Sequence, residues 1–265
     1  MTLSDYFDRL EAPTRTVTVY APPPRPAIVD RIETETGVDA VDYRPLPAAA
    51  AADQGFLVVR ESEQRYASRE DERGVTAGNR HASRETGDFV AAIGLEAARE
   101  FLEPPIVAPW DETDADAAYR RVIEVFEATV WRALDRRQLL AISREIEARA
   151  WRVGGGTLRV SFQRAAALEA MAPVYVRLAG ESALDVHVYI ADDWERPAIP
   201  GVTIHADAGP EIGEFWAITF DGDGDELRTS GLVARERADG TFEGYWTDDA
   251  ALVAELEEAL RDSVD

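Results

Sequence analysis

The chain has 265 residues, with 51 acidic and 28 basic side chains and a formal net charge of −23. Hydrophobic residues make up 46% of it, which is enough for a sizeable core and excludes a disordered chain. Neither cysteine nor lysine occurs, so disulfides, thiolate metal sites, cysteine nucleophiles and lysine Schiff bases are excluded.

Charge and hydropathy also predict the cellular location of the protein and which partners it does not bind. No apolar run approaches the roughly 18–20 residues of a membrane span. Three acidic residues, Asp5, Asp8 and Glu11, stand where a signal peptide would be basic and then apolar. We therefore expect a cytoplasmic protein with no membrane contact. Without clustered positive charge, direct binding to nucleic acid is not expected either.

The first segment, 1–112, is predicted to be an α/β half. Alternating β-branched residues predict strands, and apolar residues spaced three and four apart predict helices. The expected helices cover 3–10, 26–37 and 95–102, and the expected strands cover 16–20, 38–43, 56–59 and 89–93. Residues 62–88 are polar and nearly free of large apolar side chains, which predicts a mobile insertion.

The middle segment, 113–153, is predicted to be a pair of helices that bridges two halves. Apolar stripes favour helices over 114–134 and 135–153, and Asp135 followed by Gln138 is typical of a capping box. The glycine triplet at 154–156 follows a helix and precedes a strand. That order predicts a helix C-cap rather than a phosphate-binding loop.

The last segment, 154–265, repeats the α/β pattern of the first. The expected strands cover 158–162, 184–190, 202–205, 215–220, 230–236 and 242–246, and the expected helices cover 165–178 and 249–260. After the helix at 3–10, the first segment runs strand, helix, strand, continues with further strands and ends in a helix, and the last segment follows the same order. We therefore predict an α/β fold of two similar strand-helix-strand-strand-strand-helix halves, joined in one mixed-sheet body and bridged by the central helical pair.

The residues of acid–base, nucleophilic and metal chemistry do not form a recognisable motif. The three histidines, His81, His187 and His205, lack metal-ligand spacing and are interpreted as structural. The acidic run at 221–225 lacks the glycine and glutamate positions of a calcium loop, so a turn between strands is expected. No catalytic residue, metal or cofactor is predicted.

A ligand-binding rim is predicted in the last segment. Ligands of open α/β sheets bind beyond the carboxyl ends of the strands, where arginine and aromatic side chains can hold an anionic or planar molecule. The residues expected there are Gln163, Arg164, Asp192, Trp194, Arg235 and Glu236, with Trp246 beneath them. Core tryptophans with surface arginines are the alternative interpretation.

Four segments in the last part of the chain carry a family resemblance: 137–163 (RQLLAISREIEARAWRVGGGTLRVSFQ), 184–194 (LDVHVYIADDW), 232–236 (LVARE) and 242–249 (FEGYWTDD). Through these segments, the sequence from residue 137 onward resembles the DICT sensory domain in the stand-alone form of halophilic archaea. Near the end of this motif, Asp248 and Ala250 replace the aromatic residue and the proline that are usual in the family. Many acids and no lysine also fit a proteome adapted to molar salt, which screens this charge.

Each half is more distantly similar to a degenerate half of the phospholipase D fold. An active member of that group needs a histidine and a lysine in each half, and this chain has no lysine. The similarity therefore implies a fold without that activity.

The resemblance implies a non-catalytic signal-input protein that binds a small ligand or a signalling partner. The expected partners are two-component or transcriptional signalling proteins acting in trans, and a homodimer is compatible with the sequence. Two alternatives stay open: a metal-free enzyme that uses arginine and carboxylates at a sheet edge, and a pure protein-interaction scaffold. Two titratable groups within hydrogen-bond reach in one cavity would favour the enzyme, and the lack of any cavity would favour the scaffold.

Overall fold

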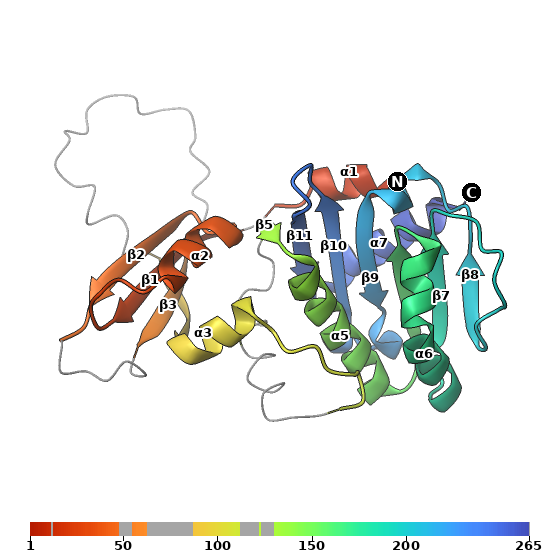
Figure 1. The fold of residues 1–265 in the computed structure, drawn as a ribbon, viewed down its shortest axis with the longest axis horizontal. Helices are drawn as coiled ribbons and strands as arrows, with labels where there is room; N and C mark the ends of the chain where they lie inside the picture. The colour runs from red at the N-terminus through yellow and green to blue at the C-terminus, as the bar shows by residue number, and fades with distance from the viewer. Residues whose placement is uncertain (12, 48–54, 63–86, 112–121, 123–129, 265) are drawn as a thin grey trace.

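The chain folds into an α/β protein with two separate mixed sheets (Figure 1). The computed structural model describes all residues except 12, 48–54, 63–86, 112–121, 123–129 and 265. The predicted α/β class is therefore confirmed. The mobile insertion predicted at 62–88 lies outside the described residues, apart from its two ends in strands. Among the described residues, no helix is both long and apolar enough to cross a membrane.

The smaller sheet is built by the first half of the chain and has the strand order β2-β1-β3-β4. Its strands are β1 (Thr14–Ala21), β2 (Ala40–Pro45), β3 (Phe56–Ser62) and β4 (Asp88–Gly94), and its helices are α2 (Ile28–Glu35) and α3 (Leu95–Leu102). Alternate residues of β1 are buried, as the alternating sequence predicts, and they pack against α2 and α3.

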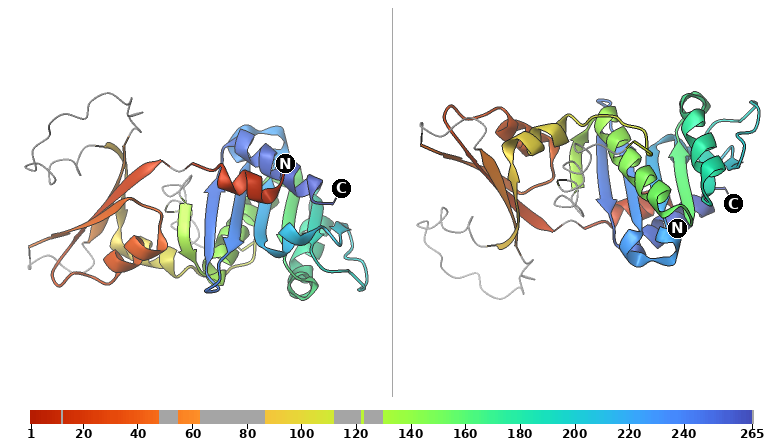
Figure 2. Two further views of the ribbon diagram at one scale, coloured as in Figure 1. Left: turned by 90° about the horizontal axis from the view of Figure 1, so that it is seen from above. Right: turned by 90° about the horizontal axis from the view of Figure 1, so that it is seen from below.

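The larger sheet has seven strands in the order β5-β11-β10-β9-β6-β7-β8. Its strands are β5 (Val130–Leu134), β6 (Thr157–Phe162), β7 (Asp185–Ile190), β8 (Val202–His205), β9 (Phe215–Phe220), β10 (Ser230–Glu236) and β11 (Phe242–Thr247). Helices α5 (Arg136–Val153) and α6 (Ala165–Glu181) cover one face. Helices α7 (Ala250–Asp262) and α1 (Leu3–Asp8) cover the other (Figures 1 and 2).

The internal repeat is visible in how the strands pair. In the smaller sheet, β1 is parallel to β2 and antiparallel to β3, which is antiparallel to β4. In the larger sheet, β6 is parallel to β7 and antiparallel to β9, which is antiparallel to β10. The four central strands of both halves therefore follow one topology. The predicted mixed-sheet body therefore consists of two mixed sheets, one from each half.

The predicted bridge of two helices is half correct. Helix α5 begins at the predicted capping box, where the Gln138 N–H donates to Asp135 at 2.8 Å and the Asp135 N–H donates to Gln138 at 2.8 Å. The helix predicted over 114–134 is wrong for 130–134, which form β5, and most of the remainder lies outside the described residues. β5 pairs with β11, so sheet pairing overrides the helical apolar pattern there.

Side chains of α5 also join the two halves. The Gln138 Nε2 donates to Glu35 at 3.0 Å and to the Leu102 carbonyl at 3.2 Å, and the Arg137 Nε donates to the Pro104 carbonyl at 2.9 Å. The first helix, α1, lies against α7 of the larger sheet, where the terminal amine meets Asp262 at 2.6 Å. Residues 3–8 therefore belong spatially to the C-terminal half and not to the first.

Candidate functional site

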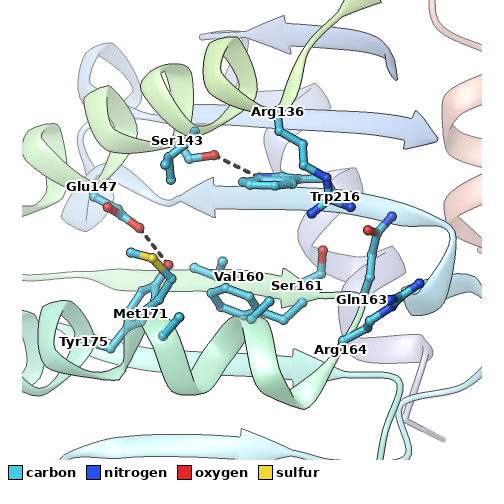
Figure 3. Close-up of a pocket in the computed structure, with 14 residues that line it drawn as sticks. Arg136, Ser143, Glu147, Val160, Ser161, Gln163, Arg164, Met171, Tyr175 and Trp216 are labelled. Carbon is cyan, nitrogen blue, oxygen red and sulfur yellow. Dashed lines mark hydrogen bonds between the residues drawn. The ribbon is translucent and has the colours of Figure 1, made fainter. Parts of the chain in front are cut away.

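A cavity of about 310 Å³ lies between α5 and α6, over strands β6 and β9 (Figure 3). Its walls are mostly apolar side chains: Leu140, Val160, Phe162, Ala167, Ala170, Met171 and Trp216. Polar groups lie at its two ends. Figure 3 shows Glu147 and Tyr175 at one end and Arg136, Gln163 and Arg164 at the other. This is the composition typical of a small-molecule site.

The two helices that form the cavity are each anchored at their ends. Helix α5 ends at Gly154, whose φ of 75° provides the left-handed C-cap predicted from the glycine triplet. Helix α6 begins beyond Arg164, where the Ala165 N–H donates to Asp192 Oδ2 at 3.0 Å. Capping by an acidic side chain at a helix N-terminus is stabilising, so Asp192 has a structural role at the edge of the cavity.

A buried triad of polar side chains lies at the end of the cavity that Glu147 and Tyr175 form. Arg144 and Glu147, one turn apart on α5, form an ion pair with side-chain exposures of 8% and 2%. The Tyr175 hydroxyl of α6 donates to Glu147 at 2.7 Å. Burial raises the pKa of Glu147, and Arg144 opposes that rise. Burial raises the pKa of the Tyr175 hydroxyl well above its ordinary value, and the charge of Glu147 raises it further.

The wall formed by Trp216 is held by a hydrogen bond from the sheet to α5. The Trp216 Nε1 donates to Ser143 Oγ at 2.9 Å, as Figure 3 shows. This bond orients the indole, so its ring covers the sheet side of the cavity. Met171, on α6, approaches Arg144 with its sulfur 3.5 Å from the guanidinium. Met171 also lines the cavity, so its side chain links the cavity wall to the buried ion pair.

The structure brings only part of the predicted rim into this cavity. Gln163 and Arg164 line it, and Asp192 caps the helix that begins there. Trp194 does not line it, and its indole N–H donates to the Pro197 carbonyl at 3.3 Å. Glu236 does not line it either, and its backbone N–H donates to the Glu214 carbonyl at 3.2 Å.

Two predicted rim residues lie elsewhere in the sheet. Arg235 points to the opposite face, where it meets Asp8 at 3.2 Å and stacks over Phe7 at 4.8 Å. Successive side chains of a strand alternate between faces, and Arg235 shares the face of Val233. Trp246 faces the core, but its indole N–H donates to Ser230 at 2.9 Å, at the start of β10 and away from Gln163.

Sequence reasoning missed Arg136, Ser143, Glu147, Tyr175 and Trp216 as cavity residues. The sequence signal for the buried triad is the spacing of Arg144 and Glu147, which lie three residues apart on α5, where opposite charges can pair. The apolar stripe of Leu139, Ile142 and Ile146 does not predict their burial, because Arg144 lies on nearly the opposite side of the helix. Charged residues are rarely fully buried unless they are paired, and the pair becomes internal only where α6 packs on α5.

A second cluster of titratable groups, outside the cavity, involves the two described histidines. His187 Nδ1 lies 3.1 Å from His205 Nε2, and His205 stacks on Tyr189 with ring centroids 4.5 Å apart. His187 Nε2 lies 3.0 Å from Asp185. Burial lowers the pKa of His205, and the neighbouring His187 and Arg159 lower it further.

The His205 pKa predicts a loss of stability in acid. A histidine whose folded pKa lies below its unfolded value stabilises the fold above about pH 6.5, and this contribution is lost as the pH falls. We expect the melting temperature of the wild type to fall more between pH 7.5 and 5.5 than that of His205→Asn, at constant salt. Equal pH slopes for the two proteins would show that His205 does not act in this way.

Among the described residues, no group of three or more histidine or acidic side chains is arranged to hold a metal ion. The acidic run at 221–225 forms two short 3₁₀ turns in which carboxylates cap backbone N–H groups. Asp221 accepts from Thr157 and Asp223, each at 2.9 Å, and Asp225 accepts from Leu227 at 3.1 Å. These carboxylates therefore stabilise the turn as acceptors of backbone hydrogen bonds.

No protein-family model matches the chain, and no curated protein matches it either. Among solved structures, the crystal structure of polyphosphate kinase from Porphyromonas gingivalis aligns with 98% of this chain at a TM-score of 0.33 and 10% sequence identity. The chain spans about half, 47%, of the length of that protein. A similarity at this level defines neither a shared fold nor a shared activity.

Proposed function

We propose that this chain is a non-catalytic signal-input protein that binds a small molecule in the cavity between α5 and α6. The observation that carries the proposal is a preformed cavity of about 310 Å³ whose walls are mostly apolar, with polar side chains at its two ends. It falls within the segment that resembles the DICT sensory domain. A preformed cavity also favours this function over a scaffold without a ligand.

The enzyme alternative is favoured by one observation, since Glu147 and Tyr175 are two titratable groups 2.7 Å apart in the cavity. Both groups are already engaged, however. The Tyr175 proton is held by Glu147, and Glu147 also pairs with Arg144. A general base needs a free lone pair directed at its substrate, so this triad is better suited to holding α5 and α6 together.

A ligand between α5 and α6 would contact both helices and the central strands at once. Gln138 and Arg137 of α5 donate hydrogen bonds to the first half of the chain. A shift of α5 would therefore change these contacts. We propose that the ligand biases this helix and that the change is read in the cytoplasm by a two-component or transcriptional signalling protein acting in trans.

The proposed function is tested by retention of small molecules at high salt. The purified chain is incubated with a small-molecule extract of a salt-loving archaeon, separated from unbound compounds, and its bound compounds are identified by mass spectrometry. Ala167→Trp fills the cavity and should abolish retention. Ala166→Trp, one residue away on α6 and outside the cavity lining, should preserve it.

The outcomes separate the three functions. A compound recovered unchanged, near one per chain and lost in Ala167→Trp, supports the proposal. A product that accumulates in excess of the protein favours the enzyme instead. Retention of no compound by the wild type would contradict ligand binding and leave the scaffold.

A further inference from the structure

We infer that the ligand is an amphipathic anion, with an acidic head group at Arg136, Gln163 and Arg164 and an apolar body between α5 and α6. This inference rests on the proposed function and assigns its ligand class. The three polar residues lie at the same end of the cavity in Figure 3, with Arg136 on α5 and the other two after the end of β6.

The first support is the charge at this end. Within the part of the chain that the structure describes, no carboxylate lies within ion-pair distance of Arg136 or Arg164. Arginines elsewhere do find acidic partners, for example in the pairs Arg9–Glu255, Arg25–Asp30, Arg31–Glu35, Arg177–Glu181 and Arg196–Glu169. Arg136 and Arg164 both line the cavity and are both exposed, so their guanidinium groups are accessible to an anionic group that enters from solvent.

The second support is hydrogen-bonding capacity. The Gln163 Nε2 is buried and has no hydrogen-bond partner among the described residues. A buried donor without a partner costs about 1–3 kcal/mol, which an acceptor on a ligand would offset. Arginine guanidinium groups are donors only. Arg136 is also steadied by the Phe242 ring, 5.8 Å from its guanidinium carbon. The end of the cavity thus offers donors to an anionic oxygen.

The third support is the other end, which is unsuited to a cation. Glu147 is the only acidic residue among those that line the cavity, and Arg144 and Tyr175 already occupy it. Glu147 lies eleven residues beyond Arg136 on α5, or roughly 16 Å along the helix axis. Apolar walls fill the space between these ends, so an apolar body of one or two rings, or a short alkyl chain, fits there.

The inference is tested by calorimetric titration with 2-naphthoate and with its neutral analogue, 2-naphthalenemethanol, at one fixed KCl concentration. Charge-assisted hydrogen bonds of about 1.5–3 kcal/mol predict that the acid binds roughly 10–100-fold more tightly than the alcohol. Arg164→Gln and Arg136→Gln should each weaken the binding of the acid by about tenfold or more and leave the affinity for the alcohol unchanged. Arg196→Gln, which changes a half-buried arginine outside the lining, is the control and should change neither affinity.

Two results would overturn the inference. If acid and alcohol bind equally, and Arg164→Gln is silent, the cavity is a binding site without anion preference, and the proposed function survives. If neither probe binds the folded wild type, the assigned ligand class is wrong. The proposed function is then decided by the retention experiment and the Ala167→Trp variant, which do not depend on these probes.

Discussion

Replacing Glu147 by leucine is expected to lower the free energy of unfolding by about 3–5 kcal/mol. The side chain of Glu147 is 2% exposed and pairs with Arg144, which is itself buried. Leucine leaves the Arg144 charge in the core without a partner and also removes the acceptor of the Tyr175 hydroxyl. Urea denaturation at a fixed KCl concentration measures the loss directly.

Two further variants make this prediction specific. Glu181→Ala removes the acidic partner of an exposed pair with Arg177 on α6 and should cost less than about 1 kcal/mol. The double variant Arg144→Met/Glu147→Leu removes both charges and should recover most of the stability that Glu147→Leu loses. Equal effects of Glu147→Leu and Glu181→Ala would contradict a buried ion pair.

Replacing Gly156 by alanine is expected to lower the free energy of unfolding by about 2–6 kcal/mol. Gly156 has a φ of +87°, which is strained for any side chain, and an added Cβ would lie 2.4 Å from Asp221 Oδ1 and 2.8 Å from the Asp223 nitrogen. Those atoms belong to the turn that ends β9, so relief of the clash would break the bonds from Asp221 to Thr157 and Asp223. The backbone strain and the overpacking each contribute on the order of 1–3 kcal/mol.

Gly180 gives the matched control. It lies in α6, and nothing lies within 4 Å of the Cβ that alanine would add. Gly180→Ala should therefore be neutral or stabilise the fold by up to about 1 kcal/mol through helix propensity. A Gly156→Ala variant as stable as Gly180→Ala would contradict this prediction, because it would show that the turn at 221–225 accommodates the added methyl group without loss of stability.

Local signals in the sequence predicted local structure well. Asp135 and Gln138 form the capping box, Gly154 ends α5, and the acidic run at 221–225 forms turns. These features depend on a few adjacent residues. The strand at 130–134 could not be predicted in this way, because its pairing partner β11 lies more than one hundred residues further along the chain.

The candidate site was predictable only in part for a related reason. Gln163 and Arg164 follow β6, and the carboxyl-end rule places them correctly at the edge of the sheet. The same rule does not assign a face, and Arg235 lies on the face of α1 and α7. The contacts of Glu147 with Tyr175 and of Ser143 with Trp216 join residues 28 and 73 positions apart. Pairings of that kind depend on how the helices pack on the sheet.

Ligand binding in the cavity is measured most directly through the methyl signals of the two methionines in the chain. Met171 lines the cavity, and Met1 lies beside α1 on the opposite face of the sheet, with its sulfur near Arg9. With ¹³C-methyl-methionine labelling, assigned by Met171→Leu, titration with 2-naphthoate should shift the Met171 methyl signal saturably and leave Met1 in place. A Met171 signal that does not move, or moves only together with Met1, would contradict binding of an amphipathic anion between α5 and α6.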